Sequence, residues 1–222
     1  ETGEMGISIL PVDVNKSVAE FGVEGKNIRF GFNAVKSMGR PTITAIIEER
    51  TNNGDFHSMQ DFITRMAGVI NKRTVEHLIL AGAFDTFGNT RRGMMNVYER
   101  MIDSAVKQNK DAISGQMSLF DFVSEEDKQS LEMKVPDIQE FEKEDLLERE
   151  KEVLGVYVTG HPLDEYTGMW EKHISARSTD FLIDEETGQA KLMNGSKQTI
   201  GGLISNIKVI TTGSGQQLSL IH

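Results

Sequence analysis

The sequence predicts an α+β chain that is mostly helical through its first two thirds and ends in β-structure. Apolar residues recur at helical spacing between residues 28 and 110, and turn-forming residues separate the runs. Near the end, the β-branched residues of 199–212 and the alternating residues of 217–221 flank Gly213-Ser214-Gly215, a pattern typical of a two-stranded hairpin. Between these regions, 108–137 lacks sustained periodicity, and the helical pattern returns over 138–155.

The charge of the chain is distributed unevenly. Its 222 residues suffice for one medium domain or two small ones. The formal net charge of −10 argues against a protein that coats nucleic acid uniformly, because the phosphate backbone repels it. However, residues 28–110 hold 12 basic and 8 acidic residues, whereas residues 121–152 hold 5 basic and 13 acidic residues. A mildly basic module is therefore followed by an acidic one.

Cysteine is absent, which excludes disulfides and thiolate metal sites and is compatible with a reducing cytoplasm. No apolar run approaches the roughly 18 residues that a membrane helix needs, and the polar start does not read as a signal peptide. The first residue is not Met, and the last six, Gln-Leu-Ser-Leu-Ile-His, read as a strand. We therefore expect an excised piece of a longer polypeptide.

The elements expected before the connector follow in order. A short apolar run over 7–10 predicts a strand, and Pro11 ends it. Four helical segments come next: 28–36, then Pro41 to Arg50, then 58–66 capped by Ser58, then a segment capped by Asn71 that stops at Gly82. A long helix from Asn89 to about Lys107 completes this region.

The turn Ser37-Met38-Gly39 joins the first two helical segments. Proline suits the first turn of the second helix, and such a turn points backbone N–H groups outward, which favours an anion. The pattern resembles the helix-hairpin-helix motif of proteins that bind DNA without sequence specificity, although Ser37 replaces the first Gly of the usual Gly-hydrophobic-Gly hairpin. A plain packing unit of two helices is the alternative interpretation. The candidate DNA-binding residues here are Lys36, Ser37, Met38, Gly39 and Arg40.

Pairs of basic residues stand at the start of two later helices, where they do not complement the helix dipole. Contact with phosphate is one explanation, and simple solvation is the other. The candidate residues of these two pairs are Lys72, Arg73, Arg91 and Arg92.

An apolar group interrupts the polar connector and has no obvious core to join. Such a group suits a short linear motif that fills a pocket on a partner. It resembles the bacterial sliding-clamp-binding motif Gln-Leu-(Ser/Asp)-Leu-Phe, with Met in place of the first Leu; a linker segment folding back on its own domain is the alternative. The candidate clamp-binding residues are Gln116, Met117, Ser118, Leu119 and Phe120.

No catalytic or metal-binding residue is expected in this chain. His161 lies beside Asp164, but the further ligands that a metal needs are not near in the sequence, so a structural turn histidine is the favoured interpretation. No Gly-rich phosphate loop, nucleophile elbow or strand-borne pair of Asp residues is visible. A metal-dependent hydrolase built on His161 is a minor alternative.

Four stretches in order closely resemble the C-terminal half of the bacterial DNA polymerase III alpha subunit: residues 9–17, 28–36, 71–85 and 150–164. The resemblance covers about residues 5–166, and 199–221 is similar to the opening strands of the family's OB domain. It implies 1–27 as the end of the fingers, 28–110 as the helix-hairpin-helix region and 111–137 as a linker with the clamp motif. It further implies 138–195 as a helix and connecting segment, and 196–222 as the truncated start of the OB-fold domain.

The resemblance implies a non-catalytic, cytoplasmic part of a DNA-directed DNA polymerase, a nucleotidyltransferase. Its partners would be duplex DNA, the sliding clamp and other polymerase III holoenzyme subunits, with no membrane. In that family the metal-binding aspartates lie upstream, so Mg²⁺ is expected in the parent polymerase, no cofactor in this chain, and no nucleotide incorporation by the chain alone. A clamp-associated DNA-repair accessory protein with helix-hairpin-helix binding is the rival interpretation, and the ordered match beyond both motifs argues against it.

Overall fold

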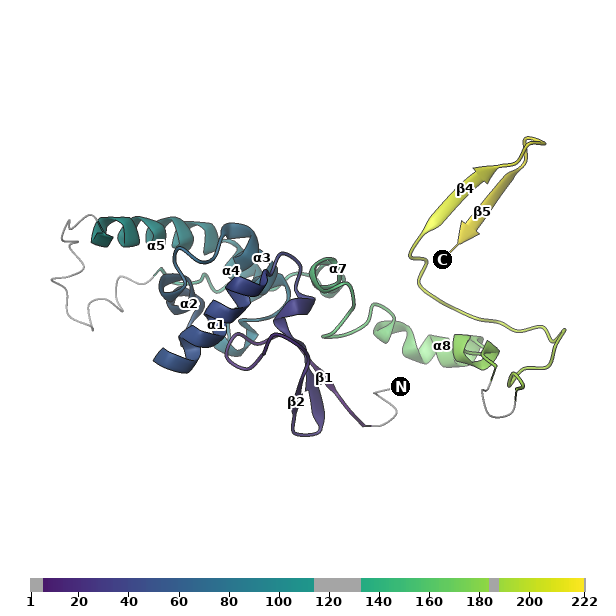
Figure 1. Cartoon of the computed structure of the whole chain (residues 1–222). Helices are drawn as coiled ribbons and strands as arrows, with labels where there is room; N and C mark the ends of the chain where they lie inside the picture. The colour runs from purple at the N-terminus through teal and green to yellow at the C-terminus, as the bar shows by residue number, and fades with distance from the viewer. Residues whose placement is uncertain (1–5, 114–132, 184–187, 222) are drawn as a thin grey trace. The chain divides into compact units, whose positions relative to one another are not determined.

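The structure is a computed structural model that describes residues 6–113, 133–183 and 188–221. The chain divides into two units, Glu1–Gly160 and His161–His222 (Figure 1). Their boundary falls inside the stretch 138–195 that the sequence predicts as one segment, because the helix after residue 142 packs back onto the first unit. No helix in the described part of the chain is long and apolar enough to cross a membrane.

A three-stranded sheet opens the first unit. Its strands are β1 (Ile9–Leu10), β2 (Gly22–Glu24) and β3 (Asn27–Arg29), in the order β1-β3-β2. β1 runs parallel to β3, and β2 runs antiparallel to β3 across a turn at Gly25. The strand predicted within 7–10 is confirmed as β1.

The helix predicted over 28–36 is wrong. The N–H groups of Ile28 and Phe30 donate at 3.0 Å to the carbonyl oxygens of Ser8 and Leu10, so the chain is extended there. Only η1 (Phe32–Ala34) is helical, and it is a single 3₁₀ turn. The pairing of β1 with β3 therefore outweighs the apolar spacing that favoured a helix.

The helices of the first unit are α1 (Arg40–Asn53), α2 (Met59–Arg65), α3 (Lys72–Leu80), α4 (Arg91–Met95), α5 (Tyr98–Ile113) and α7 (Lys143–Leu154), with a 3₁₀ turn η2 (Asp85–Phe87) after α3. Two predicted caps are confirmed. Ser58 Oγ accepts from the N–H of Asp61 at 3.0 Å, and Asn71 Oδ1 accepts from the N–H of Thr74 at 2.9 Å. Gly82 follows α3 with a φ of 82°, the left-handed conformation that ends helices.

The long helix predicted over 89–107 is interrupted and forms α4 and α5. Thr90 is the cap of α4, and its Oγ1 accepts from the N–H of Gly93 at 3.0 Å. The side-chain amide of Asn96 donates to the carbonyl of Arg92 at 2.8 Å. The backbone N–H of Asn96 is shared between the carbonyls of Arg92 and Gly93 at 3.3 and 3.2 Å, and that of Val97 donates to Met94 at 3.1 Å, so the last turn of α4 tightens to 3₁₀ spacing where the helix ends.

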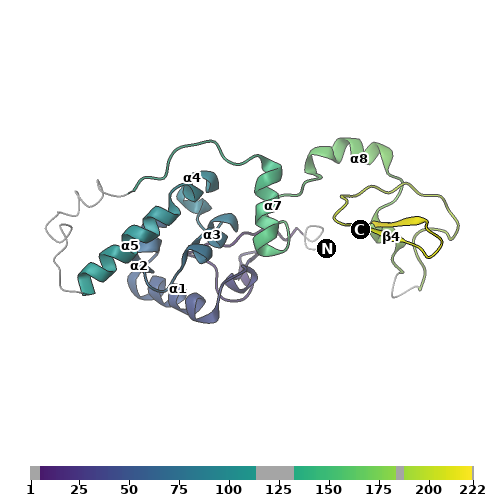
Figure 2. The ribbon, with the colours of Figure 1, turned by 90° about the horizontal axis from the view of Figure 1, so that it is seen from above.

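α7 belongs to the core of the first unit although it is distant from α3 in the sequence. It packs against α3, and Val153 and Leu154 join the buried apolar cluster of the other helices (Figure 2). Phe62 lies at the centre of that cluster, with its ring centroid 5.0 Å from that of Phe56 and 5.1 Å from that of Phe84. The helical region is therefore complete only with α7.

The second unit contains η4 (Asp164–Tyr166), α8 (Thr167–His173), η5 (Ser178–Phe181) and the strands β4 (Ile207–Thr211) and β5 (Gln217–Ile221). The predicted C-terminal hairpin is confirmed, because β4 and β5 pair antiparallel from Ile207–Ile221 to Thr211–Gln217. Its two faces both carry exposed apolar side chains, namely those of Ile207, Val209 and Ile221 on one face and Ile210, Leu218 and Leu220 on the other.

Candidate nucleic-acid interface

The turn between η1 and α1, which we name hairpin 1 (residues 36–40), has an unusual backbone. Ser37 has a φ of 67°, and it is the one non-glycine residue in the described part of the chain with a positive φ. Left-handed backbone costs a residue with a Cβ about 1–2 kcal/mol, which glycine avoids. The structure thus explains why a glycine is usual at this place in such hairpins: Ser37 adopts the conformation that glycine adopts at no cost.

Hairpin 1 leaves the N-terminus of α1 open. Gly39 is the N-cap and offers no side-chain cap, and no acidic residue stands in the first turn. The N–H groups of Ser37, Gly39 and Arg40 have no acceptor among the residues that the structure describes. By contrast, α2, α3 and α4 are each capped by a side-chain oxygen. Of these four helices, α1 is the one whose first amides remain available to an anion.

Two cations flank these amides. Lys36 and Arg40 are exposed, and neither forms an ion pair with any residue that the structure describes. Arg40 also lines a cavity of about 190 Å³ together with Glu20 and Asn33, so one acidic side chain lies on that side of the turn. Met38 is half-buried and packs against the core, which makes it an anchor of the hairpin rather than a contact residue.

A second turn of similar form, hairpin 2 (residues 67–71), joins α2 to α3, and it was not predicted from the sequence as a binding site. Gly68 has a φ of 93°, and Val69 is exposed beside it. The N–H groups of Val69 and Ile70 donate to the carbonyl of Met66 at 3.0 and 3.3 Å, so this turn keeps fewer free amides than hairpin 1. The signal in the sequence was Gly68, three residues before the Asn71 cap.

The two basic residues at the start of α3 differ in availability. Lys72 Nζ lies 3.1 Å from both Glu99 and Asp103, and the hydrogen bond to Asp103 contributes most to raising the pKa of Lys72. Its charge is thus already compensated on the surface. Arg73 is exposed and has no ion pair with a described residue, so it is the better candidate for a phosphate contact.

The prediction that Arg91 contacts DNA is wrong, because its side chain is buried. Its side chain is 3% exposed, with Nη2 2.6 Å from Asp85 and Nη1 3.3 Å from Glu150. Nη1 also donates to the carbonyl of Leu80 at 2.9 Å. A Cβ at Gly82 would lie 2.3 Å from Nη2, so this glycine makes room for the guanidinium. Arg91 is a structural cation that joins α4 to η2 and α7.

Arg92 is exposed, but the helix start that it occupies is already bound to an internal anion. The carboxylate of Glu140 accepts from the N–H of Arg91 at 2.7 Å and from the N–H of Arg92 at 2.9 Å. A phosphate can therefore bind these amides only if Glu140 moves away from them.

The predicted clamp motif at residues 116–120 lies outside the described residues.

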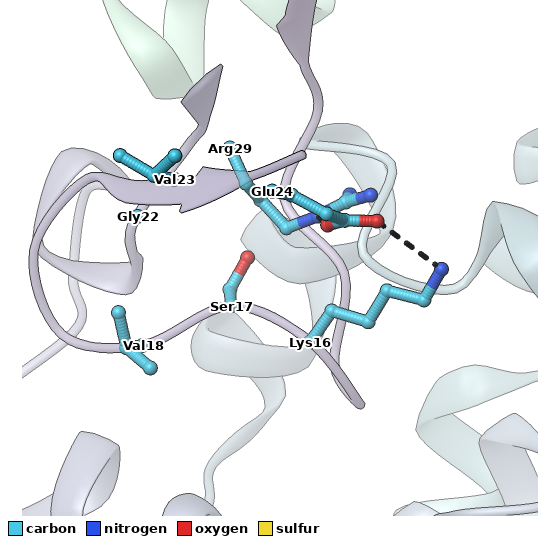
Figure 3. Close-up of a pocket in the computed structure, with 7 residues that line it drawn as sticks. All are labelled: Lys16, Ser17, Val18, Gly22, Val23, Glu24 and Arg29. Carbon is cyan, nitrogen blue, oxygen red and sulfur yellow. Dashed lines mark hydrogen bonds and ion pairs between the residues drawn. The ribbon is translucent and has the colours of Figure 1, made fainter. Parts of the chain in front are cut away.

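A cavity of about 480 Å³ lies between the segment 16–18 and strands β2 and β3, and Figure 3 shows the residues that line it. Its charges satisfy one another: Arg29 pairs with Glu24, and Lys16 Nζ lies 3.5 Å from Glu24 Oε1. The hydrogen bond from Arg29 holds the pKa of Glu24 below its usual value. None of the candidate DNA-binding residues lines this cavity.

His161 takes part in a turn. Its N–H donates to Asp164 Oδ2 at 2.7 Å, and its Nδ1 accepts from the N–H of Leu163 at 3.1 Å. Within residues 6–113, 133–183 and 188–221, no three His, Asp or Glu side chains are grouped so that they could hold a metal ion.

Comparison with known proteins agrees with this geometry. A family model described as a helix-hairpin-helix motif matches residues 6–94, a range that includes both hairpins. The DNA polymerase III subunit alpha of Vibrio cholerae is 32% identical over 223 residues, which cover 100% of this chain. The chain is homologous to a segment of DNA polymerase III subunit alpha.

The DNA polymerase III alpha relatives come from distant bacteria. That of Chlamydia pneumoniae is 36% identical over 202 residues, 84% of this chain, and that of Mycobacterium leprae is 33% identical over 205 residues, 92% of this chain. The aligned residues make up 18%, 16% and 17% of the Vibrio, Chlamydia and Mycobacterium proteins. The chain therefore spans less than a fifth of the length of these relatives.

Proposed function

We propose that this chain binds the backbone of duplex DNA, without reading base sequence, and that hairpin 1 is the principal contact. The observation that carries the proposal is the open N-terminus of α1, where amides and two cations, Lys36 and Arg40, have no partner among the described residues. Backbone amides and basic side chains that meet phosphate oxygens fix a protein on DNA but carry no sequence information. Binding by such contacts alone lies at about 10⁻⁴ to 10⁻⁶ M at physiological salt.

The other basic residues rank behind hairpin 1. Arg73, beside hairpin 2, would add a second phosphate contact. Lys72 would contribute little while Glu99 and Asp103 hold its charge, and Arg92 would act through its side chain alone. Two short contacts on one compact unit would bind the duplex locally and with modest affinity.

We infer that the longer protein is a polymerase that uses this segment away from its reaction centre. The support is the name that its relatives carry, DNA polymerase III subunit alpha, and the small share of their length that aligns. Nucleotidyl transfer, its Mg²⁺ and the contacts with other holoenzyme subunits in the cytoplasm would then belong to the longer protein, and the chain alone would not incorporate nucleotides. Residues 116–120 would bind the sliding clamp, so that clamp and hairpins together raise the effective concentration of DNA.

The hairpin of β4 and β5 would be the opening of an OB-fold domain. A two-stranded hairpin is at best marginally stable alone in water. Because this one has apolar residues on both faces, other parts of a protein must pack against both faces, as happens to the strands of a small barrel. Further strands of the longer polypeptide would supply that cover. Single-stranded template is the ligand that such a domain would bind.

Arg40→Ala tests the DNA contact directly. The affinity for a short fluorescent DNA duplex should fall, and the slope of log K against log salt should become shallower by about 0.9, the value for one lost phosphate contact. Lys26→Ala is the matched control, because Lys26 is an exposed cation in the turn between β2 and β3. Equal effects of the two substitutions would refute hairpin 1 as the site, since they would reflect net charge alone.

A further inference from the structure

The backbone of Lys36, where hairpin 1 begins, is held by hydrogen bonds to two other elements of the first unit. The carbonyl oxygen of Lys36 lies 2.7 Å from Nδ1 of His77, which is on α3. The N–H of the same residue donates to the carbonyl of Val153, at the end of α7, at 3.0 Å. Both backbone polar groups of Lys36 are thus engaged by two helices that pack side by side in the first unit (Figure 2).

This hydrogen bond fixes the state of the imidazole. A carbonyl oxygen carries no proton, so Nδ1 of His77 must carry the shared one and donate it. In the neutral ring, Nε2 is then the acceptor nitrogen. The bond therefore selects one of the two imidazole tautomers, which is a property that can be measured without DNA.

The same bond also sets the direction of the first free amide. The peptide between Lys36 and Ser37 is planar and trans, so its C=O and N–H point in opposite directions. Because the carbonyl points to His77 on α3, the N–H of Ser37 points away from α3. Ser37 is also in the left-handed conformation, which a residue with a Cβ leaves readily if nothing holds it.

We propose that His77 is a positioning residue for DNA binding: by holding the Lys36 carbonyl, it keeps the N–H of Ser37 and the start of α1 aimed at a backbone phosphate. The inference rests on the proposed DNA contact of hairpin 1. His77 itself touches no phosphate. Its effect on DNA is exerted through the peptide that it orients.

His77→Ala should weaken binding of the DNA duplex about fivefold, the loss expected when one neutral hydrogen bond no longer fixes the peptide. The salt slope should also become shallower, because the misdirected turn loses its phosphate. His77→Asn should restore both values, since the asparagine Nδ2 occupies the place of Nδ1 and can donate to the same carbonyl. Asparagine is never charged, so its rescue would exclude a charge effect of the imidazole.

His57→Ala is the matched control, because His57 is exposed in the turn before α2 and its imidazole has no hydrogen bond to a described residue. Affinity and salt slope should be unchanged in this variant. Thermal unfolding of all variants separates positioning from folding: a loss of affinity in His77→Ala that merely followed a loss of folded protein would overturn the proposal.

NMR of the imidazole nitrogens gives a readout independent of DNA. The proposal requires the tautomer with the proton on Nδ1, and a proton on Nε2 alone would overturn it. If His77→Ala leaves binding unchanged while Arg40→Ala weakens it, the positioning role fails and the DNA contact stands. If neither weakens binding, the proposed DNA contact itself fails, and the inference falls with it.

Discussion

Glu150→Gln should lower the free energy of unfolding of the first unit by about 2 kcal/mol. Glu150 is fully buried on α7 and accepts four hydrogen bonds. Its Oε1 accepts from the N–H groups of Val158 and Thr159 at 2.5 and 2.9 Å. Its Oε2 accepts from Thr159 Oγ1 at 2.7 Å and from Arg91 Nη1 at 3.3 Å.

The magnitude follows from which of these contacts glutamine keeps. Its carbonyl oxygen can still accept from both backbone N–H groups. Its NH₂ group then faces the Thr159 hydroxyl, which can turn to accept, and Arg91, which can only donate. One charge-assisted contact is lost, which costs about 1.5–3 kcal/mol. Arg91 keeps its pair with Asp85, so the cost stays below the 3–5 kcal/mol typical of a buried charge left alone. Glu150→Leu, which removes every acceptor, should reach about that higher range.

Urea unfolding followed by helical circular dichroism measures this effect, since the first unit holds most of the helices. The midpoint should fall while the slope of the transition stays unchanged. Glu148→Gln is the matched control, because Glu148 is exposed on the same helix, and its effect should stay within about 0.5 kcal/mol. If both substitutions shift the midpoint equally, the buried network does not hold α7 as the structure indicates.

Three further outcomes are expected. Ser37→Gly should raise the free energy of unfolding by about 0.5–1 kcal/mol with DNA affinity retained, because it relieves the left-handed serine; lower stability in the urea assay would contradict this. Leu119→Ala with Phe120→Ala should abolish clamp capture in a pull-down and leave DNA affinity intact, and unchanged capture would remove the motif assignment. The hydrogen bond from Arg65 holds the pKa of Glu49 below 4.5, so the stability that this pair adds is present above about pH 4.5 and is lost as the pH falls through the folded pKa. Arg65→Ala should raise that pKa in an NMR titration, and an unchanged pKa would show that Arg65 is not its cause.

Local signals in the sequence predicted the parts of the fold that local chemistry controls. Ser58 and Asn71 cap their helices because each short polar side chain reaches an amide three residues on. The C-terminal hairpin formed as expected, since Gly and Ser between β-branched runs favour a tight turn. Neither prediction required knowledge of distant contacts.

The errors arose where distant contacts decide. The sequence predicts a helix over 28–36, yet the N–H groups of Ile28 and Phe30 donate to the carbonyl oxygens of Ser8 and Leu10 in the sheet. Arg91 reads as a surface cation in a basic pair, and only the fold brings it to Asp85 and Glu150, the latter 59 positions away in the sequence. The contact of His77 with hairpin 1 could not be predicted from the sequence, because its partner is a backbone carbonyl 41 positions earlier. Spacing along one element cannot reveal such partners.

The net charge of −10 is compatible with a grip on DNA because many of the acids are already bound to the protein's own donors. Glu140 occupies the amides at the start of α4, and Glu150 neutralises Arg91 from inside the core. Glu150 therefore adds no unpaired negative charge to the surface. The cations of hairpin 1 have no such partner in the described residues, so their local charge is available to a phosphate. Because exposed charges farther away than about 8 Å are largely screened at physiological salt, the phosphate senses mainly this local field, and the acidic total matters only at low salt.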